Sequence, residues 1–472
     1  MKLLRSKMKS FDYSTYLSPF TWRYGGEKMR IIWSEIHKRK LWRKIWVELA
    51  KVQHKEGLIS KKELDDIIKN QDKINIEKSH EFEKEIKHDL MAEIKTYASS
   101  AKIGGGKIHL GATSYDIEDN AETIRFKESL DLIEENLKNL LAGFGRKIKE
   151  YKSLPCIAYT HLQPAEPTTL GYRFASYAQD ILFDLNFLKY VLKNLKGKGI
   201  KGAVGTSASY VRLTIEQKAE DLEKEIMKNL GIDSVDIATQ IAPRKIEYFI
   251  SSFLSSVAQT LSKFAFDLRI MQSPGFGEWQ EPFGEKQVGS SAMPFKRNPW
   301  KSEQICSLAR FVNNLSNISK ENAANMLLER TLDDSANRRI YLPEMFLAIS
   351  EMLQSSIKIL EGLIINKNNI EKNLNKFGPF AITEAVLMTA VKNGGDRQKL
   401  HENLRNLSMK AWEEMQATDI NPLIEFIKND KNLTKFIKKE ILQTLLSPKK
   451  HIGLAPKKCL KFLEKIDHAL SD

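Results

Sequence analysis

Apolar residues recur at helical spacing over long stretches of the chain. They follow one face of the segment 119–151, from Ile124 and Leu130 through Ile133 to Leu141. Five more segments repeat this pattern, at 29–53, 170–195, 246–272, 303–328 and 340–363. Few segments alternate apolar and polar residues with the period of two that half-buried strands show. The pattern therefore predicts an all-α fold with long helices, each spanning roughly 35 to 45 Å.

The segment 246–272 is apolar or small on several faces, which is typical of a helix inside a core. Several such helices in one chain would leave much apolar surface bare unless subunits share a helix bundle. We therefore predict a homo-oligomer.

Changes in composition suggest three parts. From residue 366 the sequence turns to alternating Asn, Lys and Ile, after the last of the long apolar stripes. We predict an N-terminal helical domain at 1–118, a central long-helix bundle at 119–365 and a small C-terminal helical domain at 366–472.

The chain has 472 residues, of which 42% are hydrophobic, so it can bury a large core. Its net charge of +14 comes from 74 basic and 60 acidic residues spread along the whole length. This balance favours an anionic partner, either a phosphorylated metabolite or a nucleic acid. It is equally consistent with a solvated surface that has an excess of lysine.

The three cysteines, Cys156, Cys306 and Cys459, lie far apart without metal-binding spacing, so they indicate neither a disulfide framework nor a zinc site. The N-terminus has no apolar stretch typical of a targeting peptide, and no run of about 18 apolar residues is present. These features predict a soluble cytoplasmic protein with no membrane partner.

The segment 289–299 is the most unusual polar stretch. Ser290 and Ser291 follow a glycine, and Lys296, Arg297 and Asn298 come shortly after them, between two prolines. Ordinary packing does not require this combination. It suits a rigid loop that binds and activates an acidic ligand.

Two other polar positions fall near predicted helices. His88 and Asp89 lie within the predicted helix 82–98, where neighbouring side chains point about 100° apart and cannot orient each other. Thr113 and Ser114, which precede several acids, either cap the next helix or contact a ligand.

The segment 160–171 contains His161 among threonines and prolines. A lone histidine in such a turn is either a hydrogen-bonded structural group or a catalyst, and its polar neighbours make a pocket plausible.

Charged groups at two further places have two interpretations. Arg23 and Tyr24 stand at a helix entrance, where they either hold a carboxylate or phosphate or form a surface arginine packed on a ring. Arg330, Ser335 and Arg339 either surround a phosphate or form a salt-bridged surface turn.

Three of these motifs occur in a characteristic order. They are Thr-Ser-x-Asp-x-x-Asp-x-Ala at 113–121, Thr-His-x-Gln-Pro-Ala-x-Pro-Thr-Thr at 160–169, and Gly-Ser-Ser-x-Met-Pro-x-Lys-x-Asn-Pro at 289–299. Together they resemble the fumarase/aspartase superfamily. Within it, Arg23-Tyr24, His88-Asp89 and the 329–339 segment make the chain similar to the adenylosuccinate lyase family.

The resemblance implies a three-domain fold whose central helix bundle is shared in a homotetramer, with each active site built from three subunits. It implies β-elimination of fumarate from adenylosuccinate, giving AMP, and from the succinylaminoimidazole-carboxamide ribotide of purine biosynthesis. General base and general acid catalysis would suffice, without a cofactor or metal.

The resemblance also implies roles for individual residues. Ser290 would be the base and His161 the acid, although whether Ser290 or Ser291 takes the proton stays open. Ser291, Lys296 and Asn298 would bind the succinyl carboxylates. The rest of the nucleotide would contact Arg23, Tyr24, His88, Asp89, His109, Thr113, Ser114, Gln240, Arg330, Ser335 and Arg339.

Two other functions are compatible with these patterns. One is a different fumarate-releasing lyase of the same superfamily, acting on another succinyl adduct. The other is a non-catalytic basic descendant that binds nucleic acid, which should have lost Ser290 or His161 or gathered its lysines beside aromatic residues. The sequence shows neither change, so a lyase without a nucleic-acid partner is the preferred prediction.

Overall fold

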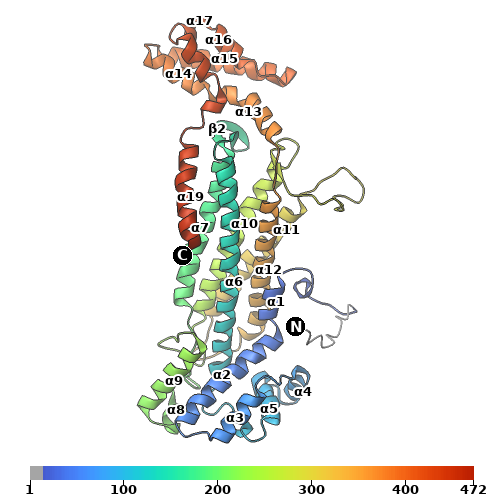
Figure 1. The fold of residues 1–472 in the computed structure, drawn as a ribbon, viewed down its shortest axis with the longest axis vertical. Helices are drawn as coiled ribbons and strands as arrows, with labels where there is room; N and C mark the ends of the chain where they lie inside the picture. Colours follow the sequence, from blue (N-terminus) through green and yellow to red (C-terminus); the bar gives the residue numbers. More distant parts are fainter. Residues whose placement is uncertain (1–13, 472) are drawn as a thin grey trace. The chain divides into compact units, whose positions relative to one another are not determined.

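Helices form most of the secondary structure in the computed structural model, which describes residues 14–471 (Figure 1). The chain divides into two units. Unit 1 comprises the described residues up to 134 together with 187–258 and 310–352. Unit 2 comprises 135–186, 259–309 and the described residues from 353 onwards.

Short elements make up the beginning of unit 1. They are η1 (Pro19–Thr21), α1 (Glu27–Ile32), α2 (Glu35–Lys55), α3 (Lys61–Asn70), α4 (Ile76–Ile86), α5 (Asp89–Ser100) and η2 (Gly105–Lys107). Two later helices of the same unit are α8 (Ala208–Leu213) and α9 (Glu216–Leu230).

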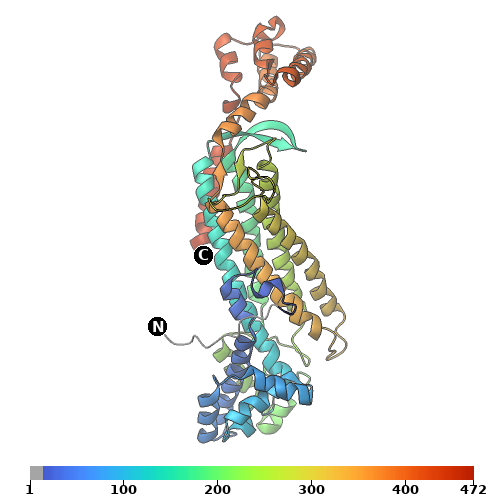
Figure 2. The ribbon, with the colours of Figure 1, turned by 90° about the vertical axis from the view of Figure 1, so that its right-hand side faces the viewer.

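Five long helices each contribute a part to both units. They are α6 (Ser114–Tyr151), α7 (Leu170–Asn194), α10 (Lys245–Met271), α11 (Trp300–Ala324) and α12 (Ser335–Glu361). Within each unit their portions run side by side (Figures 1 and 2). In unit 2, for example, Phe144 of α6 packs edge-on against Phe264 of α10. The all-α class is confirmed.

The remaining elements belong to unit 2 and follow the last long helix. They are α13 (Lys367–Ala381), α14 (Thr383–Lys392), α15 (Arg397–Thr418), α16 (Leu423–Asn429), α17 (Lys431–Thr434), α18 (Lys439–Leu445), η3 (Pro448–Lys450) and α19 (Ala455–Ser471). Buried residues between Ile382 and Leu446 form a hydrophobic core of their own. The division of the chain at residues 118 and 365 stays a prediction.

The core of the short-helix part of unit 1 forms around α2. Trp42, Ile45, Trp46 and Leu49 are buried on this helix and belong to the same cluster as Tyr97 of α5. Burial of each such side chain contributes roughly 1.5 to 3 kcal/mol. Apolar packing therefore fixes the positions of α2 and α5, two of the helices that border the cavity described below.

Local cap signals set several helix starts. Ser60 accepts a hydrogen bond from the backbone of Glu63, whose carboxylate accepts one from the backbone of Ser60, forming a capping box. The predicted helix 29–53 is divided into α1 and α2, because Ser34 caps a new helix. The predicted helices at 119 and 340 begin five residues earlier than expected, at Ser114 and Ser335.

The predicted continuous helix 82–98 is wrong. Lys87 adopts a left-handed conformation with φ of 55° and ends α4, and α5 begins at Asp89. A left-handed residue cannot continue a right-handed helix. His88 and Asp89 consequently lie at a helix N-terminus rather than on the side of a helix.

The polar turn predicted at 160–169 is part of a β-hairpin. Strand β1 (Pro155–Thr160) pairs antiparallel with β2 (Gln163–Thr169). His161 and Leu162 form the turn, with φ values of 54° and 59°. Two successive left-handed residues are what a tight type I′ hairpin turn requires. A second small sheet in unit 2 joins β3 (Trp279–Gln280) to β4 (Ile364–Ile365).

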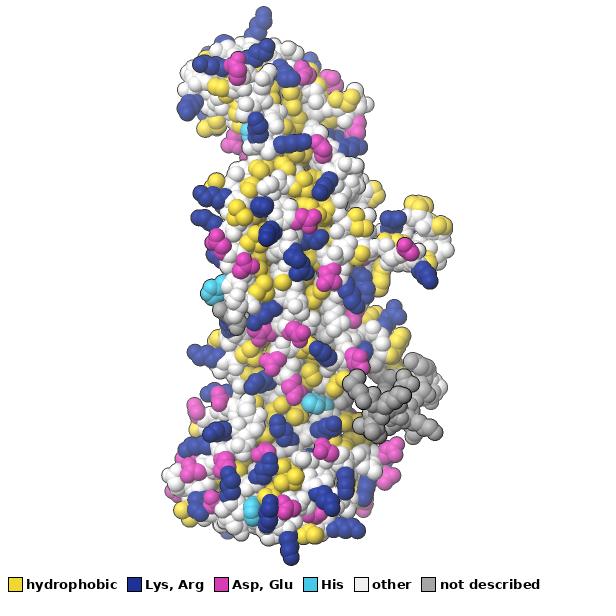
Figure 3. Space-filling model, viewed as in Figure 1, with side chains coloured by type: hydrophobic (Ala, Val, Ile, Leu, Met, Phe, Trp, Pro, Cys, Tyr) yellow, Lys and Arg dark blue, Asp and Glu magenta, His cyan; other side chains and the backbone are white. Residues whose placement is uncertain are grey.

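Lysine and arginine side chains are spread over the face shown in Figure 3 and are mixed with aspartate and glutamate. This face has no single basic patch of the kind that a nucleic-acid backbone binds. None of the helices between residues 14 and 471 has both the length and the apolar character needed to cross a membrane.

Candidate active site

The break between α4 and α5 places His88 and Asp89 at the start of α5, in unit 1. His88 is the N-cap residue, and its Nδ1 accepts a hydrogen bond from the backbone N–H of Met91 at 3.4 Å. The two side chains approach each other, with His88 Nδ1 3.8 Å from Asp89 Oδ1. Within the described residues the two side chains form no hydrogen bond with each other, and Asp89 pairs instead with Arg339. They do not orient each other, as predicted, although the continuous helix assumed in that prediction is wrong.

The start of α12 lies opposite this helix end. Ser335 is its first residue, and one turn later Arg339 Nη2 donates to Asp89 Oδ2 at 2.6 Å. Burial acts to raise the pKa of Asp89, but the hydrogen bond and charge of Arg339 hold it below its ordinary value. The structure thus brings Asp89 to two other predicted substrate contacts, Ser335 and Arg339, although 250 positions separate Asp89 from Arg339.

These three residues line a cavity of about 120 Å³ within unit 1. Helices α2, α5, α6 and α12 form its walls, and most of the lining side chains are charged or aromatic. They are Trp33, Glu35, Lys38, Trp42, Asp89, Tyr115, Glu118, Asp119, Glu122, Arg125, Ser335, Arg338, Arg339 and Pro343. Such a cavity suits a small anionic or polar group.

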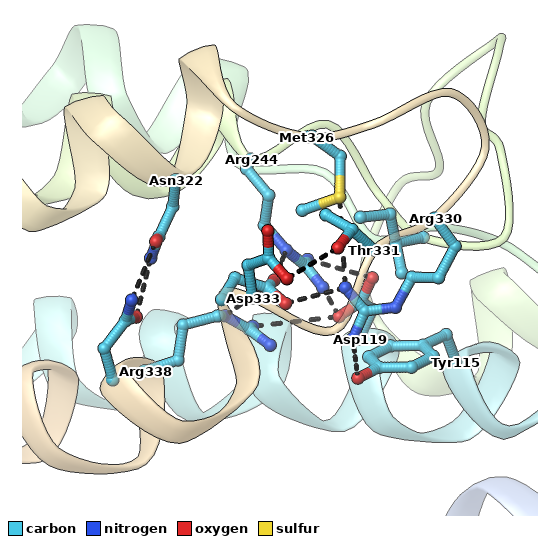
Figure 4. A network of polar contacts seen from close by, with 12 residues as sticks. Tyr115, Asp119, Arg244, Asn322, Met326, Arg330, Thr331, Asp333 and Arg338 are labelled. Carbon is cyan, nitrogen blue, oxygen red and sulfur yellow. Dashed lines mark hydrogen bonds and ion pairs between the residues drawn. The ribbon is translucent and has the colours of Figure 1, made fainter.

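A buried network of ion pairs lies beside the cavity (Figure 4). Arg244 of α10 donates to Asp119 of α6 at 3.0 and 3.1 Å and to Asp334 at 2.7 Å. Asp334 also accepts from Arg330 at 2.6 Å. Arg330 reaches the hydroxyl of Tyr115. The network connects α6 and α10 to the residues that immediately precede α12.

Asp334 is the centre of this arrangement. It is 1% exposed and stands directly before Ser335. Burial acts to raise its pKa, but the charges of Arg244 and Arg338 and a hydrogen bond from Arg330 lower it below its ordinary value. The predicted turn at 329–339 is therefore salt-bridged but partly buried, and the role of Arg330 as a substrate contact stays a prediction.

We predict that Asp334→Asn destabilises the protein and impairs substrate binding. Removing one partner from a buried ion pair costs about 3 to 5 kcal/mol, because it leaves buried charge uncompensated. The folded-state pKa of Asp334 is lowered, so its stabilisation is present at neutral pH and is lost as the pH falls through that lowered pKa. Thermal unfolding at pH 7 and steady-state kinetics measure the two effects.

The neighbouring Asp333 provides a matched control. It is exposed and, in the part of the chain that the structure describes, accepts a hydrogen bond only from Thr331 in the same loop, at 2.8 Å. Asp333→Asn should leave both the melting temperature and KM close to wild type. Equal effects of the two substitutions would show that the buried network does not support the site.

Thr113 and Ser114 begin α6, and Asp116 fixes this helix start. Asp116 accepts from the backbone N–H of Thr113 at 3.0 Å and from Lys198 Nζ at 2.6 Å. Lys198 is fully buried. The hydroxyls of Thr113 and Ser114 make no hydrogen bond to another part of the chain between residues 14 and 471, so a ligand can use them.

His109 is a neutral imidazole in this structure. Its Nδ1 accepts from the indole N–H of Trp46 at 3.0 Å, and burial lowers its pKa to about 4. The indole is only a donor, so the proton of His109 resides on Nε2. Any contact of His109 with substrate would therefore be an uncharged N–H donation.

Three other predicted contacts, Gln240, Arg23 and Tyr24, have partners within unit 1. The backbone N–H of Gln240 donates to the carbonyl of Glu329 at 3.3 Å, next to Arg330. Arg23 is exposed, donates to the Tyr24 hydroxyl at 3.3 Å and lies over the Tyr24 ring. The pair thus has the geometry of an arginine packed on a ring, and its contact with substrate stays a prediction.

The loop 289–299 belongs to unit 2 and is organised around Ser290. The Oγ atom of Ser290 accepts from the backbone N–H groups of Ala292 at 3.3 Å and Met293 at 3.1 Å. Asn298 closes the loop by donating to the carbonyl of Gly289 at 3.0 Å. A Cβ atom at Gly289 would lie 1.8 Å from the Lys296 carbonyl oxygen, so this close approach requires glycine.

This geometry treats the two serines differently. Ser290 is partly buried and receives two N–H donors, whereas Ser291 is exposed and accepts neither. Donors aimed at a hydroxyl oxygen stabilise its deprotonated form. Lys296 is also exposed, so its ammonium group can meet a ligand.

His161 lies at the exposed tip of the β1–β2 hairpin in unit 2. The buried carboxylate of Glu278 holds the rest of the hairpin in place. Glu278 has no exposed surface and accepts from Tyr159 at 3.3 Å, from Arg173 at 3.1 Å and from Asn373 at 3.1 Å. Arg173 also donates to the carbonyl of Ile157 in β1. These contacts hold the base of the hairpin while its tip stays open to solvent.

The predicted residues are therefore collected into two groups. Unit 1 brings Asp89, Ser335 and Arg339 to one cavity, and unit 2 places Ser290 and Asn298 in one closed loop. Within residues 14–471, no hydrogen bond or ion pair joins His161 to Ser290. The same part of the chain contains no cluster of three His, Cys, Asp or Glu side chains that could hold a metal ion.

Sequence reasoning did not assign a role to Glu118, Asp119, Arg244 or Asp334. Asp119 looks like one more acid in the first turns of a helix, and Arg244 resembles a cation at a helix entrance. Their pairing joins positions separated by 125 residues, for Arg244 and Asp119, and by 90, for Arg244 and Asp334. A single sequence carries no local signal for such distant contacts.

Comparison with known proteins defines the class of the chain. Residues 22–313 match the family model described as "Lyase", and residues 379–462 match the one described as "Adenylosuccinate lyase C-terminus". The chain is therefore an enzyme of the lyase class.

Relatives along nearly the whole chain define the particular family. A protein of Schistosoma mansoni is 37% identical over 468 residues, covering 97% of this chain and 96% of the relative. Proteins of Saccharomyces cerevisiae (35% identical, 97% and 96% covered) and Methanocaldococcus jannaschii (36%, 93% and 93%) are similarly close. All three are named adenylosuccinate lyase, and the chain belongs to the adenylosuccinate lyase family.

Solved structures share the same fold. A fumarate lyase from Mesorhizobium sp. BNC1 superimposes with a TM-score of 0.83 at 23% identity, covering 95% of this chain and 99% of that structure. The 3-carboxy-cis,cis-muconate lactonizing enzyme from Pseudomonas putida gives 0.85 at 21% identity, covering 96% and 99%. These likenesses concern the fold alone.

Proposed function

We propose that this chain catalyses the reaction for which its family is named, the β-elimination of fumarate from adenylosuccinate to give AMP. We also propose the matching cleavage of the succinylaminoimidazole-carboxamide ribotide in purine nucleotide biosynthesis. The observation that carries the proposal is the match to adenylosuccinate lyases from end to end, at 35 to 37% identity for the three relatives above.

The chemistry requires one base and one acid. The base takes a proton from the carbon of the succinyl group that is β to the nitrogen. The electron pair of that C–H bond forms the double bond of fumarate, and the C–N bond breaks. The acid supplies a proton to the departing nitrogen, so this nitrogen leaves as the neutral amino group of AMP.

Ser290 is the proposed base and His161 the proposed acid. A free hydroxyl is a weak base near neutral pH, so it needs donors that stabilise its alkoxide. The two backbone N–H groups directed at Ser290 Oγ supply this stabilisation. Lys296, six residues further along the same loop, adds positive charge to the loop. Ser291, Lys296 and Asn298 are the proposed contacts of the succinyl carboxylates.

The nucleotide part of the substrate carries a phosphate, and the cavity in unit 1 contains guanidinium and hydroxyl donors for it. Arg339 and Ser335 are the proposed phosphate contacts there. The remaining proposed contacts of the nucleotide are Arg23, Tyr24, His88, Asp89, His109, Thr113, Ser114, Gln240 and Arg330.

The proposed assembly is a cytoplasmic homotetramer whose active sites combine residues of three subunits. Large apolar side chains exposed on the long helices support an assembly. Phe183 on α7 is 62% exposed, Phe266 on α10 52% and Ile340 on α12 60%. Apolar side chains on long helices are typically covered in helix bundles. Sedimentation equilibrium of the purified protein tests the tetramer.

The function is tested by incubating the purified protein with adenylosuccinate and following AMP and fumarate by absorbance. Turnover supports the proposal. A folded protein that leaves adenylosuccinate intact but releases fumarate from argininosuccinate, malate or aspartate would instead be the other lyase considered above.

We predict that Arg339→Gln chiefly raises KM and changes kcat much less. The phosphate is the same in the substrate and in the transition state, so losing a charge-assisted contact to it weakens the binding of substrate and of transition state equally. The expected loss is about 1.5 to 3 kcal/mol, or roughly 10- to 150-fold in binding. Steady-state kinetics with adenylosuccinate measures this effect.

Arg405→Gln is the matched control, because Arg405 is exposed on α15 and, among the described residues 14–471, pairs only with Glu402 on the same helix surface. Its kinetics should match those of the wild type. A fall in kcat without a change in KM in Arg339→Gln would remove Arg339 from ground-state binding of the phosphate.

A further inference from the structure

Glu118 of α6 stands out among the acids that line the unit 1 cavity. Five carboxylates face this space, and four have a basic partner. Glu35 pairs with Lys38 at 2.9 Å, and Glu122 with Arg125 at 3.0 Å. Asp89 pairs with Arg339 at 2.6 Å. Asp119, the fourth, pairs with Arg244 of the buried network at 3.0 Å.

Glu118 makes no hydrogen bond or ion pair with any residue of the described range 14–471. The cations of the cavity are already engaged by other acids, including Arg338, which pairs with Glu247 of α10 at 2.6 Å. The remaining titratable group is Tyr115, whose hydroxyl contacts Arg330. Glu118 is therefore the single lining carboxyl, within the described part of the chain, that has no direct hydrogen-bond or ion-pair partner.

Such a position favours the neutral form of a carboxyl group. Glu118 is partly exposed at the cavity wall, but the loss of water around its carboxyl raises its pKa to about 8, and the nearby negative charge of Asp89 acts in the same direction. Arg339 and Lys38 oppose the shift without cancelling it. At neutral pH Glu118 is then mostly a carboxylic acid, and an acid O–H can donate a hydrogen bond where a carboxylate would repel an anion.

We propose that Glu118 is a nucleotide-binding residue that contacts the substrate's phosphate in its protonated form, donating its O–H beside Arg339 and Ser335. The inference rests on the proposed function, because it takes the unit 1 cavity as the phosphate site. It adds a proton linkage to that site: phosphate binds to the enzyme whose Glu118 is neutral, and ionisation of Glu118 opposes binding.

The affinity for a phosphate should fall as the pH rises, because ionised Glu118 and the phosphate are both negatively charged. A phosphate has a second pKa of about 6, so its charge is nearly constant between pH 7 and pH 9. Over the same range Glu118 passes from mainly protonated to mainly ionised. If only the protonated form binds, the dissociation constant for AMP should rise by about tenfold from pH 7 to pH 9.

The test is calorimetric titration of the full-length protein with AMP at pH 7 and pH 9, in two buffers of different ionisation enthalpy. Wild type should lose about tenfold in affinity at pH 9 and take up about one proton per AMP bound there. Glu118→Gln keeps a neutral hydrogen-bond donor of the same shape. It should bind AMP at pH 7 nearly as tightly as wild type, lose the fall in affinity at pH 9 and take up no such proton.

Glu135→Gln is the control on the same helix, since Glu135 is exposed and lies outside the cavity. It should retain the pH dependence of wild type. Identical pH dependence in Glu118→Gln and wild type, or failure of wild type to bind AMP, would overturn the inference. Turnover of adenylosuccinate by wild type is measured separately, so the proposed function can stand while the role of Glu118 fails.

Discussion

Ser290→Ala is expected to reduce kcat by about a hundred- to ten-thousandfold, the usual range for loss of a general base. Binding of substrate should change little, because the hydroxyl contributes mainly when it takes the proton. The reason is local: Ser290 Oγ is the acceptor of two backbone N–H groups that stabilise its alkoxide. Single-turnover kinetics with adenylosuccinate, together with equilibrium binding, measure the two quantities.

Ser291→Ala is the matched comparison, one residue further along the same loop. The exposed Ser291 hydroxyl is not held by those donors, so its loss should mainly raise KM through a missing carboxylate contact. A large fall in kcat for Ser291→Ala with near-normal kcat for Ser290→Ala would exchange the two roles. The pair of variants therefore decides which serine takes the proton.

His161→Ala is expected to have a loss of similar size, about a hundred- to ten-thousandfold in kcat, with substrate still bound. Without the acid, the departing nitrogen must leave without a positioned proton donor. His161 lies at a hairpin tip whose base is fixed by Glu278 and Arg173, so removing the imidazole should leave the fold unchanged. Thermal unfolding and steady-state kinetics separate the two effects.

His80→Ala is a suitable control, because His80 is another exposed histidine and lies on α4, outside every proposed contact. It should retain wild-type kcat and KM. If His161→Ala also keeps near-normal kcat, His161 is not the acid, and the hairpin has only a structural role.

The long helices were predictable because their apolar residues repeat every three to four positions, a signal contained in the local sequence. The predicted segment 246–272 agrees with α10 (Lys245–Met271) to within one residue at each end. The capping box at Ser60 was also readable, since its two hydrogen bonds join residues three apart. Both are short-range effects.

The sequence was less informative where one residue changes the backbone direction. Lys87 interrupts the helix predicted at 82–98 by adopting a left-handed conformation, although lysine normally favours a helix. The hairpin at 155–169 was missed because Pro164 and Pro167 argue against a strand. In both places packing overrides local preference.

The motifs alone predicted the family, which the comparisons confirm. They also led to the proposed roles of Ser290, His161 and Lys296, because these positions are defined by spacing along the chain. Tertiary structure alone decided which charges compensate each other. The pairing of Arg339 with Asp89 spans 250 positions. Glu118 lacks a direct ion-pair partner because the cations that line the cavity pair with other acids. These pairings form when helices that are distant in sequence pack together, because an unpaired buried charge is costly. A local sequence pattern cannot predict them.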